Sequence, residues 1–119
     1  MRVLVVDDAA VMRALLSAIL RSNGFEVAGE ASGGADGLAQ YRALQPDVVT
    51  LDVTLPDMDA AGAVRALLAA DSAACIIACG FSSQRALIDA ACAAGARGYV
   101  AKPFAPRQVA EALERVRNP

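Results

Sequence analysis

Asp47-Val48-Val49-Thr50-Leu51-Asp52 is the stretch that decides the fold of this chain. It is short, apolar and β-branched, and it lacks strict polar alternation, so it predicts a strand covered on both faces, as in a parallel sheet. Asp52 would then emerge at the carboxyl edge of the sheet, where open α/β sheets bind their ligands. The run at 1–6 is similar and ends in Asp7-Asp8. If the two strands are parallel neighbours, three carboxylates meet at one edge.

The length and composition indicate one domain spanning residues 1–119. No apolar run reaches about 18 residues, so no membrane insertion is expected. The first residues enter a strand pattern without a signal-peptide layout, which favours the cytoplasm. The net charge of −2 and the pI of about 4.9 argue against binding to nucleic acid.

The three cysteines are Cys75, Cys79 and Cys92, and the sequence contains no histidine and no Cys-x-x-Cys motif. A zinc site is therefore not expected. The pattern favours buried free thiols in a reducing compartment.

Strand-like and helix-like segments alternate along the chain, which predicts repeated βα units and a parallel sheet. The expected strands are 2–6, 26–31, 47–52, 74–79 and 97–101. The expected helices are 10–22, 35–44, 59–70, 83–94 and one that begins near Pro106. Right-handed crossovers would place the carboxyl ends of all strands on one edge.

Apolar residues at helical spacing predict the faces that two of these helices bury. The expected inward residues are Met12, Leu15, Leu16, Ile19 and Leu20 in the first helix, and Leu87, Ile88, Ala91 and Cys92 in the fourth. Asn23-Gly24 is expected to end the first helix, because both residues tolerate positive φ.

Asp7, Asp8 and Asp52 would bring three negative charges together, and like charges disfavour mutual ionisation. A hard divalent cation resolves this, and Mg²⁺ prefers carboxylates, waters and phosphate oxygens. A backbone carbonyl near Thr54 could add a ligand. Taken singly, Asp7-Asp8 could instead cap a helix, and Asp52 could be an ordinary loop acid.

Lys102 is the only lysine of the chain, and it stands at the end of the fifth expected strand, on the same edge. Its ammonium could pair with a carboxylate or a phosphoryl oxygen, although a surface lysine placed by chance is the alternative. A carboxylate nucleophile, a metal and a lysine together make a phosphoryl acceptor, because phosphoryl transfer relies on positioning and electrostatics.

Four motifs of this chain resemble those of the receiver domain of bacterial two-component response regulators, and its layout is closest to the single-domain chemotaxis regulators of that family. The resemblance covers essentially the whole chain. The matching segments are 5–13 (VVDDAAVMR), 51–59 (LDVTLPDMD), 94–96 (AGA) and 102–104 (KPF).

The resemblance implies a flavodoxin-like (βα)5 fold: a doubly wound parallel sheet with strand order 2-1-3-4-5 between two helical layers. This order is a known property of such receivers, which serve as a standard example of the fold.

The resemblance also assigns roles to individual residues. It implies Asp52 as the phosphoacceptor, Asp7, Asp8 and Asp52 as Mg²⁺ ligands together with the Thr54 main-chain carbonyl, and Lys102 as the lysine that contacts the phosphoryl group, before a cis bond to Pro103. It places Tyr99 at the position of the rotating aromatic residue, for which an ordinary aromatic at a strand edge is the alternative.

Three departures from the family pattern concern the switch. Gly80 stands where the family carries a serine or threonine whose hydroxyl binds the phosphoryl group. Phe81 replaces a small residue and could crowd the pocket, and Ser82 or Ser83 could substitute if the loop shifts. Ala60 replaces a glycine; if that position needs positive φ, alanine costs about 1 kcal/mol.

For function, the resemblance implies transfer from a histidine kinase to Asp52, with output through the face of the fourth helix, fifth strand and fifth helix to a protein such as a flagellar motor switch protein. The chain is expected to be a monomer, not an enzyme, and to act without an output domain after its last helix. Gly80 and Phe81 motivate an alternative, a receiver-like binding module independent of phosphorylation. Two other protein classes fit less well. An aspartate-based phosphatase would carry Asp-x-Asp after the first strand, and the adjacent Asp7-Asp8 does not match that motif. A flavodoxin-type cofactor protein would bind a phosphate at this loop, but Asp7-Asp8 would repel a phosphate that lacks a metal bridge.

Overall fold

Strands and α-helices alternate along the chain in the computed structural model, which describes residues 1–117. The strands are β1 (Arg2–Val6), β2 (Glu26–Ala31), β3 (Val48–Asp52), β4 (Ile76–Gly80) and β5 (Gly98–Ala101). The helices are α1 (Ala10–Ser22), α2 (Gly34–Leu44), α3 (Ala60–Ala70), α4 (Arg85–Ala94) and α5 (Pro106–Arg117), with a short 3₁₀ helix, η1 (Ser82–Gln84), before α4.

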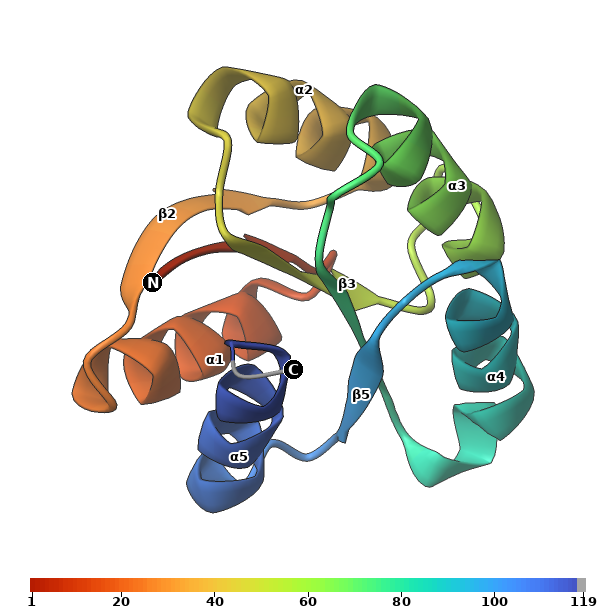
Figure 1. Ribbon diagram of the computed structural model, residues 1–119. Helices are drawn as coiled ribbons and strands as arrows, with labels where there is room; N and C mark the ends of the chain where they lie inside the picture. Colours follow the sequence, from red (N-terminus) through yellow and green to blue (C-terminus); the bar gives the residue numbers. More distant parts are fainter. Residues whose placement is uncertain (118–119) are drawn as a thin grey trace.

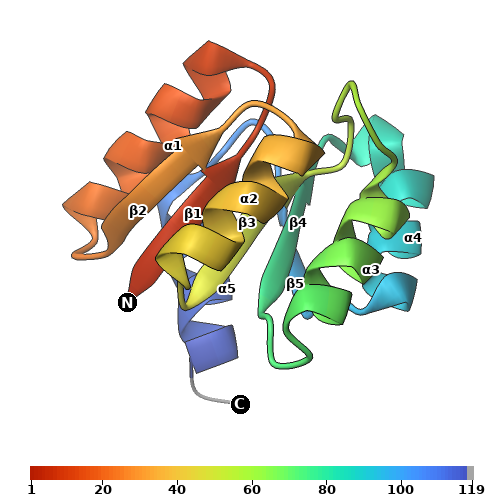
Figure 2. The ribbon, with the colours of Figure 1, turned by 90° about the horizontal axis from the view of Figure 1, so that it is seen from above.

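All five strands form one parallel sheet in the order β2-β1-β3-β4-β5. Helices α1 and α5 lie on one face of the sheet, and α2, α3 and α4 lie on the other (Figures 1 and 2). The expected fold class and strand order are therefore confirmed. None of the described helices combines the length and apolarity that a bilayer crossing would require.

The sheet separates two apolar cores, because successive residues of a strand face opposite sides. Leu4, Val49 and Ile76 pack towards α2, α3 and α4, whereas Val5 and Ile77 pack towards α1 and α5. Cys75 and Cys79 are buried and Cys92 is half-buried, and all three are free thiols.

Two residues expected in the helix cores are exposed instead. Leu15 of α1 is 41% exposed and Leu87 of α4 is 39% exposed. The buried stripe of α1 follows Leu16, Ile19 and Leu20, and Leu15 is turned by about 100° from Leu16 around the helix axis. An apolar stripe of five residues is thus wider than the part of the helix that the sheet covers.

Pairing with neighbouring strands sets the ends of β4. This strand begins two residues later and ends one residue later than expected, and Gly80 pairs with Ala101 of β5. The expected start of the fourth helix at residue 83 is also corrected, since Ser82–Gln84 forms the 3₁₀ turn first. The other bounds differ by one residue at most, as at Gly34, Val48, Ala60 and Gly98.

Helix α1 ends before Asn23-Gly24, as expected, and the backbone φ values show what these residues and Ala60 contribute. Gly24 has φ +83°, but Asn23 has φ −101°, so only the glycine uses the left-handed region. Ala60 is the first residue of α3, after the cap Asp59, whose side chain accepts a hydrogen bond from the Gly62 N–H. Among the described residues other than glycine, only Gln45 has positive φ, so Ala60 carries no such conformational cost.

Candidate functional site

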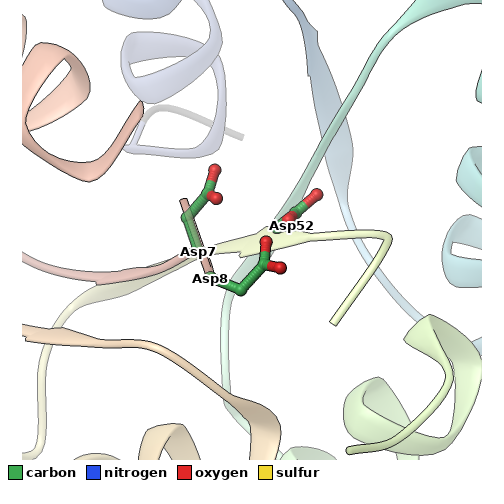
Figure 3. Close-up of side chains that lie close together, drawn as sticks. All are labelled: Asp7, Asp8 and Asp52. Atoms are coloured by element: carbon green, nitrogen blue, oxygen red, sulfur yellow. The ribbon is translucent and has the colours of Figure 1, made fainter. Parts of the chain in front are cut away.

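Asp7, Asp8 and Asp52 come together at the carboxyl edge of the sheet (Figure 3). Val6 pairs with Leu51, so the residues that follow β1 stand beside the last residue of β3. One carboxylate oxygen from each acid lies within 4.8 Å of the others. Asp7 and Asp52 are 3% and 1% exposed, whereas Asp8 is open to solvent. Two of the three carboxylates are therefore buried, and the third is accessible to solvent.

Lys102 is the residue that follows β5, and its side chain extends into this cluster. Its Nζ lies 2.8 Å from Asp7 Oδ2 and 3.2 Å from Asp52 Oδ1, and its side chain is only 4% exposed. The backbone N–H of Lys102 donates to the Gly80 carbonyl at 2.9 Å, which extends the β5 ladder to the base of the side chain. The lysine side chain thus spans the end of β4 to reach the acids.

The ion pairs control the protonation state of Lys102. Burial by itself lowers the pKa of the ammonium, but the hydrogen bond to Asp7 and the charge of Asp52 oppose it, and the pKa is raised above its ordinary value. The ammonium therefore stays charged at neutral pH. One ammonium offsets only one of the three carboxylates, so the site retains an excess of negative charge.

Short-range hydrogen bonds orient the two buried acids. Asp7 Oδ1 accepts from the Ala9 N–H at 2.9 Å, at the start of α1. Asp52 Oδ1 accepts from the N–H and from the hydroxyl of Thr54, each at 3.2 Å. Asp7 thus acts both as a local turn acceptor and as a partner of Lys102. The Thr54 carbonyl remains a predicted ligand.

The donor set fits Mg²⁺. All three groups are hard oxygen donors with excess negative charge, and one of them faces solvent, where waters can complete an octahedron. Ligands at about 2.0–2.1 Å from one ion lie up to about 4.2 Å apart. A grouping within 4.8 Å therefore needs only small side-chain adjustments.

The end of β4 differs from the acidic edge. A Cβ on Gly80 would stand 2.8 Å from Val53 Cγ2, 3.1 Å from Gln84 Oε1 and 3.2 Å from Ile88 Cγ1, so other side chains already crowd the space of a residue-80 side chain. Phe81 is 38% exposed, and the Lys102 ammonium lies 5.8 Å from its ring centroid. The ring therefore lies at the mouth of the site, beside the ammonium.

Tyr99 lies on the outer surface of β5 and is 45% exposed. The Arg85 guanidinium stands 5.1 Å from its ring centroid, and Arg85 Nη1 donates to the tyrosine hydroxyl at 3.4 Å. Tyr99, the predicted switch residue, thus contacts Arg85, the first residue of α4.

Sequence analysis missed Gln84. Its side-chain Oε1 accepts a hydrogen bond from the Phe81 N–H at 2.9 Å, three residues back along the chain. The spacing matches half of a capping box, in which a glutamine reaches back to the N–H of the residue that opens a helix. The signal was weak because phenylalanine is no usual N-cap.

The sequence matches the model of the response regulator receiver domain family over residues 3–114. The chain belongs to this family. The receiver domain is 44% identical over 115 residues to the chemotaxis protein CheY of Thermotoga maritima, a match that covers 97% of this chain and 96% of the relative. It is 41% identical to CheY of Bacillus subtilis, with 98% of both chains covered.

Solved structures agree with this assignment. The receiver domain superposes on a structure described as a CheX-CheY-BeF3-Mg²⁺ complex from Borrelia burgdorferi with a TM-score of 0.92 and 26% identity, covering 100% of this chain and 90% of the other. A chemotaxis protein CheY4 from Vibrio cholerae gives a TM-score of 0.87 at 30% identity, with 97% of both chains covered.

Proposed function

We propose that this receiver domain accepts a phosphoryl group on Asp52 from a phosphohistidine of a histidine kinase and signals by changing its binding to a downstream protein. The observation that carries the proposal is the contact of the buried Lys102 ammonium with both Asp7 and Asp52, at 2.8 Å and 3.2 Å, beside the solvent-exposed Asp8. This arrangement holds a carboxylate nucleophile next to a fixed positive charge.

The reaction is a substitution at phosphorus. A carboxylate oxygen of Asp52 forms the new P–O bond, the P–N bond to the imidazole breaks, and the imidazole nitrogen keeps the electron pair and takes a proton from solvent. Lys102 holds its charge through the step and faces the developing negative charge. Asp7 and Asp8 would hold Mg²⁺, and a bound Mg²⁺ would neutralise charge on the transferred phosphoryl oxygens.

The relatives support a chemotaxis pathway, because two of them are chemotaxis CheY proteins at 44% and 41% identity. The partners would be a histidine kinase upstream and a protein such as a flagellar motor switch protein downstream, bound at the α4–β5–α5 face. In this proposal the domain is a cytoplasmic monomer that accepts a phosphoryl group and is not an enzyme.

The proposal is tested with the purified protein, Mg²⁺ and acetyl phosphate, followed by intact-mass measurement. One phosphoryl adduct is expected, with none in Asp52→Ala and none in EDTA. Asp36→Ala, which removes an exposed acid in the first turn of α2 that does not belong to the Asp7–Asp8–Asp52 group, is the control and should be phosphorylated like the unmodified protein. An adduct that persists in Asp52→Ala would contradict the proposal.

A second candidate is a receiver-like binding module that does not need phosphorylation. The crowding around Gly80 favours this second candidate. Residue 80 carries no hydroxyl to bind a phosphoryl group, and a side chain at this position would have to displace Val53. Such a module would bind its partner equally with and without acetyl phosphate, and Asp52→Asn would leave that binding unchanged.

A further inference from the structure

The carboxamide of Gln84 borders the position that a side chain on Gly80 would take. Its Oε1 lies 3.1 Å from the place of a Gly80 Cβ and accepts a hydrogen bond from the Phe81 N–H at 2.9 Å. The absence of a side chain at residue 80 is what makes room for this contact. Gln84 is half-buried, at the end of η1.

The Phe81 N–H follows the end of β4, the strand that lies beside the one carrying Asp52. Asp52 pairs with Cys79 across the β3–β4 ladder, and Phe81 is two residues beyond Cys79. The Lys102 ammonium connects the two places, 3.2 Å from Asp52 Oδ1 and 5.8 Å from the Phe81 ring centroid. A phosphoryl group on Asp52 therefore enters a space bordered by the end of β4.

We propose that Gln84 replaces the missing hydroxyl as the group that senses the phosphoryl group; this rests on the proposed phosphorylation of Asp52. A hydroxyl and a carboxamide share the needed property, because each can both accept and donate a hydrogen bond. In the unphosphorylated structure the carbonyl oxygen of Gln84 accepts from the Phe81 N–H. A phosphoryl oxygen takes over that N–H, and the carboxamide turns so that its Nε2–H donates to the phosphoryl group.

A rotation of the Gln84 side chain can affect the exposed Tyr99 through the neighbouring Arg85. Arg85, the next residue, begins α4 and holds the exposed Tyr99 through a cation–π contact at 5.1 Å and a long hydrogen bond. Release of the Phe81 N–H by Gln84 removes one of two hydrogen bonds between these residues in the turn that precedes Arg85, the other being the backbone bond from the Gln84 N–H to the Phe81 carbonyl. The Arg85–Tyr99 contact then changes with the phosphorylation state.

The serines of the same turn do not have this geometry. Ser82 and Ser83 are exposed, whereas Gln84 faces the end of β4. Ser83→Ala is therefore a matched control, since it lies in the same turn and removes a polar group without touching the Phe81 N–H.

The test uses amide NMR of the full chain with Mg²⁺ and beryllofluoride as the phosphoryl mimic. In the unmodified protein, the Phe81 backbone amide and the Gln84 side-chain amide are expected to shift together on titration. In Gln84→Ala, beryllofluoride binding should weaken by about fivefold, the value of one hydrogen bond, and the response of Tyr99 should be lost. In Gln84→Glu, a carboxylate retains the Phe81 N–H and repels the mimic, so binding should weaken further.

The outcomes separate the two proposals. If the unmodified protein shows no response to beryllofluoride with Mg²⁺, phosphorylation of Asp52 fails and the role of Gln84 falls with it. If the protein responds but the Gln84 side-chain amide stays in place, the role of Gln84 alone is overturned. Equal weakening in Ser83→Ala and Gln84→Ala would also overturn it.

Discussion

The acidic edge and the end of β4 lie side by side in this receiver domain and differ in how polar groups are satisfied. At the acidic edge, Asp7 and Asp52 are buried and share one ammonium. At the end of β4, Gly80 offers no side chain, and Val53 and Gln84 fill the space. The comparison shows that the acidic cluster and its lysine are in place, whereas the space beside Gly80 is occupied by side chains of other residues.

The strongest test of the acidic edge removes the ammonium that pairs with its buried acids. Lys102→Met should lower the free energy of unfolding in EDTA at neutral pH by about 3 kcal/mol, because two buried carboxylates then face each other without the ammonium between them. Urea unfolding measures the loss, and added Mg²⁺ should restore part of it. Arg107→Met removes an exposed ion pair with Glu111 and should stay within about 0.5 kcal/mol of the unmodified protein. Equal losses in both variants would argue against a special role for the buried pair.

The end of β4 can be tested by filling it. Gly80→Ser should cost about 2 kcal/mol in the free energy of unfolding, because its Cβ would stand 2.8 Å from Val53 Cγ2. Adding Val53→Ala should reveal a favourable coupling in a double-mutant cycle. Gly98→Ser is the control, since a Cβ on that glycine meets no atom within 4 Å. A Gly80→Ser variant as stable as Gly98→Ser would show that the space is not closed.

The comparison is sharpened by separating metal binding from the switch. Asp8→Asn should weaken Mg²⁺ binding by at least about tenfold, because it removes a ligand charge at the exposed side of the cluster. Isothermal titration calorimetry measures the affinity, with Asp36→Asn as the control. Gln84→Ala should leave Mg²⁺ affinity unchanged. A loss of Mg²⁺ affinity in Gln84→Ala as large as in Asp8→Asn would show that the acidic edge and the end of β4 form a single site.

The smallest expected effect concerns alkaline pH. Burial and the hydrogen bond to Asp71 raise the pKa of Tyr41 to about 12. The folded state then holds a proton that the unfolded state releases, so this contribution is present below pH 10 and decreases as pH rises towards 12.

The pKa of Lys102 is also raised, so the contribution of its ion pairs to the free energy of unfolding likewise decreases as pH rises above 10.5. Tyr41→Phe should remove about 1 kcal/mol of the decrease in unfolding free energy between pH 10 and pH 11. Urea unfolding across that range tests it, and the decrease that remains reports on Lys102 together with the three cysteines, whose pKa values burial also raises. An unchanged pH slope in Tyr41→Phe would place the whole effect elsewhere.

Much of the architecture could be predicted because its signals are local. Alternating apolar strands and amphipathic helices predict parallel βα units, and Asp52 follows one of those strands directly. The single lysine at the end of another strand could be assigned to the same edge by the handedness of the crossovers. The meeting of Lys102 with Asp7 and Asp52 follows from that topology.

The sequence by itself therefore determined the layers, the acidic edge and the lysine that joins it, because period and strand ends are properties of neighbouring residues. Only the tertiary structure decided that Leu15 faces solvent, that β4 extends to Gly80, and that Gln84 covers the resulting gap. These outcomes depend on how far the strands extend alongside each other and which side chains meet across loops. The exposure of Leu15 and the extent of β4 are set by packing between segments distant in sequence, whereas the Gln84 contact is a local capping bond that phenylalanine at the N-cap position signals only weakly.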